Sequence, residues 1–452
     1  MVYNYKKACI RATLLCVSFC IITFNVSNAE GKPRVQAIQA PTAKKVKRAE
    51  ARLFLGIINP DKQLRECAQY LQNCLEKSSQ CIVNVSECAD ITKKQDIINL
   101  FKQGYTIALF VNNGPSEHVL EWRIYDAIEA TMIKGRRVIK QRATVRDWAY
   151  ALADDVWPLL TQQQSSFSTK IAYVKRMPGQ WGKNSSMLCI CDNDGSYEQI
   201  LSKIPGIYVG LYWHNDTAQP RLFCSEFTKT NVRLIAVTLD QKKGVILDTP
   251  GTCVGISLSP DRTSAVYCKS GDIWYYQFNE HTKKSVHTCI IKNDGKNSSP
   301  TLLANGDIVF CSDAYSLRKA HTQARGPQVC YYHKNTGVTE LITRDGYCVG
   351  PAYTPVTDRI IYSKRHANTM QLFLYSRVTG KHTQLTFDKG NKVDCSWSPC
   401  GNYSVFCLQD SNTSRIACIQ VDTRERFFIT DKASICTCPA WSPRYDIVPL
   451  VI

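Results

Sequence analysis

Short runs of apolar and aromatic residues, separated by polar turns, fill the chain from residue 167 onward. Each run is bounded by Gly, Asn or Asp, which is typical of β-strands. Examples are Ile360-Ile361-Tyr362 and, after a turn, Leu372-Phe373-Leu374-Tyr375. Because the same succession of four runs recurs along the chain, the sequence predicts an array of one repeated unit.

A short motif ending near a proline marks each repeat, as in Cys438-Pro439-Ala440-Trp441-Ser442-Pro443 and Cys395-Ser396-Trp397-Ser398-Pro399. With the last motif position as anchor, the copies fall at residues 215, 260, 304, 355, 399 and 443. An apolar residue stands two positions before every anchor, and we expect it to pack between repeats. These residues are Trp213, Leu258, Leu302, Tyr353, Trp397 and Trp441. Repeats of four strands are the blades of a β-propeller, so we predict six blades.

The register of the repeats predicts how the ring closes. The first repeat starts with the strand at 170–174 and has no motif strand before it, whereas little chain follows the last motif at 438–443. We therefore expect the C-terminal segment to supply the inner strand of the first blade. A ring closed in this way leaves no open sheet edge for another chain to pair with.

The region 53–164 alternates between strand and helix patterns. Strands are predicted at 53–58, 82–85 and 105–111, and helices after Asp61, at 91–103 and at 144–160. Segments 118–127 and 133–140 form a predicted hairpin with Gly135 near its turn. This alternation indicates a small α/β domain, and because it lacks a glycine-rich loop at a strand–helix junction, no nucleotide site is expected.

Two segments precede this domain. Residues 1–29 have a basic start, an apolar run and small residues at Ser27 and Ala29, which predict a signal peptide cleaved after Ala29; a membrane anchor is the alternative. Residues 30–52 form a polar, basic arm. The stretch Arg34-Val35-Gln36-Ala37-Ile38 alternates polar and apolar positions, so it could add a strand to a partner's sheet. A featureless tether is the other interpretation.

Charge and motifs favour binding over catalysis. The formal net charge is +18, but the basic residues are scattered and no nucleic-acid motif accompanies them. A solvated surface explains the charge, and an anionic envelope surface is the alternative. The chain has neither Gly-x-Ser-x-Gly nor His-Glu-x-x-His. We expect a protein that is not an enzyme, with no catalytic residue, metal or cofactor, and a mature chain without a transmembrane segment.

The 22 cysteines fall into groups. Cys224, Cys268, Cys311 and Cys407 occupy one blade position, which suits buried packing. Cys253, Cys348 and Cys436 share another position, where a metal site near the channel mouth is an alternative to packing, although paired C-x-x-C spacing is missing. A disulfide among Cys67, Cys74, Cys81 and Cys88 is a further option.

The propeller start, Phe167-Ser168-Thr169-Lys170-Ile171-Ala172-Tyr173-Val174, resembles that of the TolB family of the Tol–Pal system of Gram-negative bacteria. Trp122-Arg123-Ile124-Tyr125-Asp126, Lys134-Gly135-Arg136 and the closing motif at 438–443 resemble the same family, and so does the order of the predicted parts. Those parts are a signal peptide (1–29), a flexible arm (30–52), an α/β domain (53–164) and a six-bladed propeller (167–452). Degraded motifs at 211–216 and 300–306, the long basic arm and the cysteine content depart from the family pattern.

The resemblance implies a periplasmic adaptor that supports outer-membrane integrity and cell division. It implies that the propeller binds the peptidoglycan-associated lipoprotein Pal, that the arm binds TolA, and that other Tol proteins are partners. Matching positions for lipoprotein contacts are Thr252, Gly255 and Ser298, although Thr252 stands where family members carry a histidine. The alternatives are a sugar-binding or hydrolytic envelope propeller and a module of a secreted peptidase complex.

Overall fold

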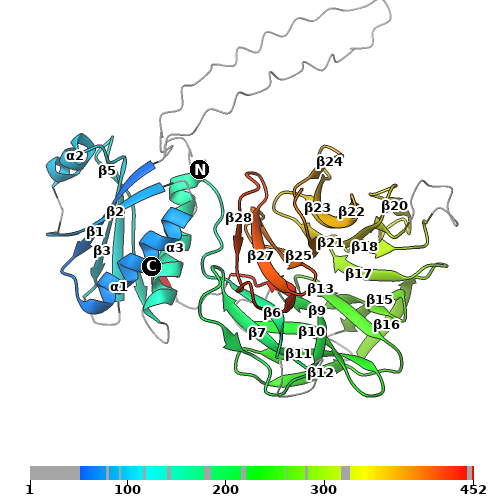
Figure 1. The fold of residues 1–452 in the computed structure, drawn as a ribbon. Helices are drawn as coiled ribbons and strands as arrows, with labels where there is room; N and C mark the ends of the chain where they lie inside the picture. The colour runs from blue at the N-terminus through cyan, green and yellow to red at the C-terminus, as the bar shows by residue number, and fades with distance from the viewer. Residues whose placement is uncertain are drawn as a thin grey trace, which may run out of the picture. The chain divides into compact units, whose positions relative to one another are not determined.

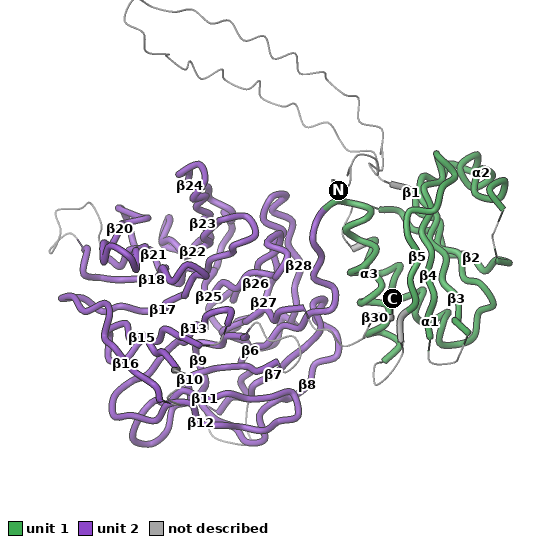
Figure 2. Tube along the Cα trace, turned by 180° about the vertical axis from the view of Figure 1, so that it is seen from behind, with its two compact units in different colours: residues 1–162, 447–452 green, residues 163–446 purple. Residues whose placement is uncertain are grey.

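A computed structural model describes residues 51–77, 81–90, 93–115, 119–139, 144–177, 185–214, 220–261, 263–279, 284–316, 326–444 and 450–451 (Figure 1). The predicted signal peptide and the arm residues 34–38 lie outside these ranges. The chain divides into two compact units, residues 1–162 with 447–452, and residues 163–446 (Figure 2). Among the helices of the described residues, none has both the length and the apolar character needed to cross a membrane.

The first unit is a mixed sheet with helices, as predicted. Its elements are β1 (Ala51–Ile58), α1 (Lys62–Lys77), β2 (Cys81–Cys88), α2 (Lys94–Lys102), β3 (Ile107–Asn113), β4 (Val119–Asp126), β5 (Thr131–Ile139), α3 (Val145–Thr161) and β30 (Leu450–Val451). The strand order is β2-β1-β3-β4-β5-β30. β1 runs parallel to β2 and β3, and the other neighbours are antiparallel.

Strand alternation divides the apolar residues of this unit between two faces. Phe54 and Ile58 of β1 pack with Ile97 and Leu100 of α2. α1 contacts β1 and also packs beside α3. The predicted hairpin is present, but its turn spans 127–130, so Gly135 lies inside β5 opposite Arg123 rather than near the turn.

The second unit is a six-bladed β-propeller, and each blade is named here by its first strand. The β29 blade contains β29 (Cys436–Trp441), β6 (Lys170–Arg176), β7 (Ser186–Asp192) and β8 (Gln199–Ile200). The β9 blade contains β9 (Ile207–Trp213), β10 (Arg221–Phe227), β11 (Val232–Thr238) and β12 (Lys243–Leu247). The β13 blade contains β13 (Cys253–Leu258), β14 (Ser264–Lys269), β15 (Asp272–Asn279) and β16 (Lys284–Ile291).

The other three blades repeat this order. The β17 blade contains β17 (Asn297–Leu302), β18 (Ile308–Ser312), β19 (Gln328–Tyr332) and β20 (Thr339–Leu341). The β21 blade contains β21 (Cys348–Thr354), β22 (Arg359–His366), β23 (Thr369–Ser376) and β24 (Lys381–Gln384). The β25 blade contains β25 (Asn391–Trp397), β26 (Tyr403–Gln409), β27 (Ser414–Gln420) and β28 (Arg426–Phe428). All pairs within these blades are antiparallel.

The predicted ring closure is confirmed, because β29 pairs antiparallel with β6. The seam is reinforced where Lys170 N–H donates to Ser442 Oγ at 2.7 Å and Trp441 Nε1–H donates to Thr169 Oγ1 at 2.8 Å. The first strands of neighbouring blades contact one another all round the ring. The propeller was predicted to span residues 167–452, whereas Leu450 and Val451 pair with β5 of the first unit.

The residue two positions before each anchor packs between blades, as predicted. All six lie in, or pack against, apolar clusters that join two adjacent blades. Two tryptophans also hydrogen-bond across the boundary. Trp213 Nε1–H donates to the carbonyl of Ala440 at 3.1 Å, and Trp397 Nε1–H donates to that of Ala352 at 2.9 Å.

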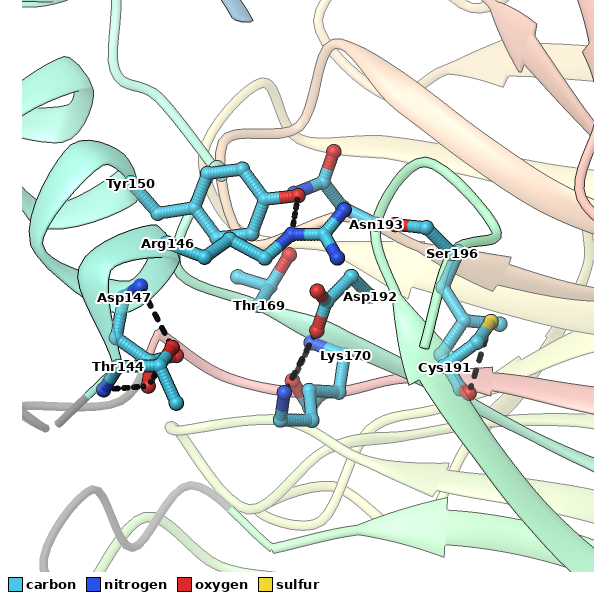
Figure 3. Close-up of polar contacts among 12 residues, drawn as sticks. Thr144, Arg146, Asp147, Tyr150, Thr169, Lys170, Cys191, Asp192, Asn193 and Ser196 are labelled. Carbon is cyan, nitrogen blue, oxygen red and sulfur yellow. Dashed lines mark hydrogen bonds and ion pairs between the residues drawn. The ribbon is translucent and has the colours of Figure 1, made fainter. Parts of the chain in front are cut away.

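Each unit also contains a local polar network (Figure 3). At the start of α3, Asp147 N–H donates to Thr144 Oγ1 at 3.2 Å and Thr144 N–H donates to Asp147 Oδ2 at 2.9 Å, which is a capping box. Within the propeller, Lys170 forms an ion pair of 2.7 Å with the buried Asp192. Thus both the last helix of the first unit and the first strand of the second have a polar residue fixed at their start.

No disulfide is formed among the nineteen cysteines of the described residues. The group at one blade position, Cys224, Cys268, Cys311 and Cys407, is buried. Three of these thiols donate to a backbone carbonyl in the first strand of the next blade, at 2.9 Å for Cys268 and 3.4 Å for both Cys311 and Cys407. Cys67, Cys74, Cys81 and Cys88 are not bridged. Cys67 and Cys74 are two helical turns apart, about 10 Å along the axis, which exceeds disulfide reach.

Candidate functional site

The candidate site lies where the six first strands begin. We call this end of the ring the channel mouth and define it by the residue eight positions before each repeat anchor. These residues are Ile207, Thr252, Lys296, Tyr347, Asn391 and Ile435. Because the blades share one topology and their first strands are neighbours, these six residues belong to the same end of the propeller.

A buried residue follows each mouth residue, and several of these tie the preceding loop to the ring. The six are Tyr208, Cys253, Asn297, Cys348, Lys392 and Cys436. Tyr208 Oη–H donates to the carbonyl of Ile204 at 3.2 Å, and Cys348 Sγ–H donates to that of Asp345 at 3.4 Å. Lys392 Nζ donates to the carbonyls of Lys389 at 2.7 Å and Gly390 at 3.1 Å. These buried side chains therefore fix the mouth loops by hydrogen bonds to their carbonyls.

This arrangement speaks against the alternative that Cys253, Cys348 and Cys436 form a metal site. Each cysteine packs in a separate cluster between blades, so the three thiols do not converge. Within the described part of the chain, no group of three or more His, Cys, Asp or Glu side chains is placed to hold a metal ion. These cysteines occupy the loop-anchoring position instead.

Five positions before each anchor, the backbone adopts a left-handed conformation. The φ values are +61° at Gly210, +68° at Gly255, +51° at Ser299, +60° at Gly350, +56° at Asp394 and +52° at Cys438. The pairing register shifts near each of these residues, which identifies β-bulges. The ring thus has a repeated bend just inside the mouth.

Gly255 suits this bend, although Ser299, Asp394 and Cys438 adopt it at the equivalent positions. Its N–H donates to Ser225 Oγ at 3.2 Å, and a Cβ atom added to it would lie 3.7 Å from Pro300 Cδ, an ordinary contact distance. Space is therefore available, but a side chain at φ +68° would cost about 1–2 kcal/mol. The backbone conformation therefore gives a physical reason for glycine at this position, which the resemblance marks as a matching contact position.

Thr252 and Ser298 are both exposed at the mouth end of neighbouring first strands. Thr252 forms a bridge with Val232, and its carbonyl accepts the N–H of Ser270 at 3.0 Å. Ser298 stands opposite Cys311 in the ladder between β17 and β18. The structure therefore brings these two predicted residues to one surface, with Gly255 between them in the chain and just inside the ring.

An exposed apolar pair at the same end was missed by sequence reasoning. Ile207 and Phe227 face each other across β9 and β10 and are 45% and 42% exposed. Phe227 also pairs with Val232, the residue bridged to Thr252. Ile207 is the repeat equivalent of Thr252, so an alignment of the repeats could have found it. Phe227 precedes no motif and gives no sequence signal.

Asp394 and Cys438, which follow one another in the ring of bends, have perturbed pKa values. Desolvation of the carboxyl raises the pKa of Asp394 although the residue is exposed, and hydrogen bonds from Cys438 partly oppose that rise. Burial, assisted by the charge of Asp394, raises the pKa of Cys438 to about 12. Its thiol is therefore protonated at neutral pH and is a poor nucleophile.

Comparison with known proteins gives a consistent result. A family model described as "TolB beta propeller domain" matches residues 157–445. Two curated relatives are named Tol-Pal system protein TolB. The one from Nitrosococcus oceani is 22% identical over 151 residues, covering 33% of this chain and 35% of the relative. The one from Syntrophotalea carbinolica is 31% identical over 78 residues, covering 17% of each. The matched regions thus span about a third of one relative and less of the other.

The fold also matches a solved structure. The crystal structure of TolB from Acinetobacter baumannii superimposes with a TM-score of 0.68 and 18% identity. The superposition covers 87% of this chain and 97% of that one. It therefore extends well beyond the propeller and supports the α/β unit followed by six blades.

Proposed function

Because the chain belongs to the TolB β-propeller family, we propose that it is a periplasmic adaptor of the Tol–Pal system that binds the lipoprotein Pal at the channel mouth. In this proposal the arm residues Arg34–Ile38 bind TolA, and the two contacts together support outer-membrane integrity and cell division. The protein is proposed to act by binding, without a catalytic step.

The observation that carries the Pal proposal is the exposed, rigid surface at the mouth. Thr252 and Ser298 expose small polar side chains there, and the neighbouring Ile207 and Phe227 expose apolar area. An aromatic anchor surrounded by a polar rim is the usual composition of a protein interface. The loops are held by hydrogen bonds from buried residues, so little conformational entropy needs to be lost on binding.

The test is to enlarge the two exposed side chains and measure Pal affinity. We expect Thr252→Arg and Ser298→Arg each to weaken binding of purified Pal at least tenfold in calorimetry, because a long charged side chain blocks close approach. Neither residue has a left-handed backbone, so the substitutions introduce no backbone strain. In Gly255→Arg, by contrast, a loss of Pal affinity could come either from blocked contact or from backbone strain.

Val378→Arg is the matched control. Val378 is 77% exposed and lies in the turn between β23 and β24, at the opposite end of its blade. Its substitution should leave Pal affinity unchanged. Equal losses in all three variants, or no loss in Thr252→Arg and Ser298→Arg, would place Pal on another surface. Turnover of a glycoside by the wild-type protein would favour a hydrolytic propeller instead.

The arm and the processing site need separate tests. N-terminal sequencing of protein recovered from the envelope should begin at Glu30, and retention of Met1 would contradict cleavage after Ala29. Deleting residues 30–47 should abolish TolA binding while Pal affinity is maintained. Unchanged TolA binding would show that the arm is a tether only.

A further inference from the structure

In two of the blades, a buried tyrosine contacts a histidine on the outermost strand. In the β21 blade, the hydroxyl of Tyr362 lies 2.9 Å from Nδ1 of His382, and the ring of Tyr375 packs on the imidazole with a centroid distance of 4.6 Å. In the β13 blade, the hydroxyl of Tyr267 lies 2.9 Å from Nδ1 of His287. Tyr362 and Tyr267 are both buried. Each imidazole is therefore fixed in place, although both histidines are exposed residues.

The pair in the β21 blade lies beside an ion pair that fixes a mouth loop. Lys364 Nζ donates to both carboxylate oxygens of Asp345, at 2.8 and 2.9 Å. Asp345 belongs to loop 342–347 between β20 and β21, and the last residue of this loop, Tyr347, is one of the six mouth residues. The charges of Lys364 and Asp345 both act on the imidazole of His382. The histidine is thus electrostatically linked to the mouth.

Protonation of His382 disturbs both contacts. A neutral imidazole can accept the hydroxyl hydrogen of Tyr362 through Nδ1, whereas an imidazolium carries a hydrogen on each nitrogen and cannot accept. The buried hydroxyl then loses its acceptor, which is unfavourable away from water. The imidazolium is also a second cation beside Lys364, and both cations attract the one carboxylate of Asp345.

The surroundings favour the neutral ring. Desolvation and then the charge of Lys364 lower the pKa of His382, and the charge of Asp345 opposes this in part. Burial raises the pKa of Tyr362, and it raises the pKa of the Cys348 thiol to about 11, so neither group gains a charge near neutral pH. The stabilisation by neutral His382 is therefore fully present above the unfolded pKa of about 6.5. It is lost as the pH falls through the lower folded-state pKa.

The β13 blade provides a natural comparison for this arrangement. Lys269 takes the place of Lys364, and the two lysines lie over the rings of Trp274 and Phe373 at 5.5 and 5.4 Å. Pro250, however, stands at the repeat position of Asp345, ten residues before the anchor. The β13 blade thus has the tyrosine, the histidine and the lysine, but no carboxylate at the loop position for which an imidazolium could compete.

We propose that protonation of His382 loosens loop 342–347 and thereby weakens binding at the channel mouth in acid. The imidazolium competes with Lys364 for the carboxylate of Asp345, so the ion pair that fixes the loop is weakened. The part of the mouth that this displaces is Tyr347, at the end of the loop. The partner affected is Pal, so this consequence rests on the proposed function, whereas the response of the loop itself does not.

Hydrogen exchange of the protein purified from the cell envelope tests the loop without a partner. The reporters are the amides of Thr343 and Cys348, which donate to the carbonyls of Val329 at 3.2 Å and Pro327 at 2.9 Å. Their protection factors, which correct for the intrinsic pH dependence of exchange, should fall about threefold or more in wild type between about pH 7.5 and about pH 5. In His382→Gln, which cannot gain a proton, they should be equal at the two pH values.

Two further variants sharpen the test. His287→Gln is the matched control, and its loop 342–347 should respond to pH as that of wild type does. Asp345→Asn should show low protection at both pH values, because it removes the ion pair with Lys364. Thermal melts should show that all variants are folded at both pH values. Equal losses of protection in wild type and His382→Gln, or no loss in wild type, would overturn the proposal.

Calorimetry with purified Pal tests the consequence at the mouth. Between the same two pH values, the affinity of wild type should fall about threefold more than that of His382→Gln, and titration of Pal itself cancels in this comparison. The same fall in both proteins would refute the link between His382 and the mouth. If Pal binds neither protein at either pH, the proposed function fails, while the exchange experiment still decides whether His382 controls the loop.

Discussion

Exchanging Ser299 for glycine or alanine tests the ring of left-handed residues directly. Ser298 and its neighbour Ser299 are both exposed in β17, but only Ser299 has a positive φ, of +51°. Alanine at position 299 destabilises the folded state by about 1–2 kcal/mol, because it must adopt the left-handed conformation. Glycine avoids that cost but loses about 0.5–1 kcal/mol in backbone entropy at either position.

The two effects predict an inverted order of stability. At position 299 the free energy of unfolding of the glycine variant should exceed that of the alanine variant by about 0.5–1 kcal/mol. At position 298 the alanine variant should be the more stable one by a similar amount. Because neither glycine nor alanine carries the serine hydroxyl, its loss cancels in the comparison of the two variants. The measurement is urea denaturation of the four variants with a shared m-value.

The same order at both positions would refute the argument. If glycine were the less stable variant at Ser299 as well, the left-handed bend would carry no local cost, and the three glycines of the ring would need another explanation. A change in m-value would indicate that a variant alters the compactness of the native or denatured state and does not act through local strain alone.

Three more predictions concern Lys392, Asp394 and the closure of the ring. Lys392→Met should cost about 2 kcal/mol in urea denaturation because it leaves the carbonyls of Asp388, Lys389 and Gly390 without their buried donor, while Lys389→Met should change stability by less than about 0.5 kcal/mol; equal effects would contradict the anchoring role. The folded-state pKa of Asp394 is raised, so the protonated carboxyl contributes stability below the unfolded pKa of about 3.9, and this contribution is lost as the pH rises through the folded-state pKa. The free energy of unfolding of Asp394→Asn, relative to that of wild type, should therefore increase from pH 4 to pH 7. A difference that stays constant over this range would be evidence against the raised pKa. Deleting residues 435–452 should destabilise the propeller far more than deleting residues 30–47, since it removes β29 and opens two sheet edges; thermal melts showing equal losses would conflict with that closure.

Local patterns in the chain were enough to predict the architecture. The repeat anchors define six blades, and the missing first strand of the first blade, together with the motif at 438–443, specifies closure by β29. The residues before the anchors, such as Trp213 and Trp397, were predicted to pack between blades because their repetition already implies equivalent environments. These features depend on periodicity and on side-chain type, which the sequence contains directly.

Details of the mouth needed the fold. The role of Cys348 and Lys392 as loop anchors depends on carbonyls that point toward them, and nothing in the residue types suggests that a lysine, a thiol and a tyrosine share one position. The pairing of β30 with β5 was equally hidden, because strand partners far apart in sequence are chosen by geometry.

The sequence by itself therefore determined the repeated unit, the number of blades, the closing strand and the separate α/β unit, since each is encoded by the local order of apolar and polar residues. Only the tertiary structure decided which side chains meet at the mouth. Ile207 and Phe227, for example, become neighbours through the register of β9 and β10. The physical reason is that secondary structure follows from short-range periodicity, whereas a binding surface is made by contacts between segments that the chain itself keeps apart.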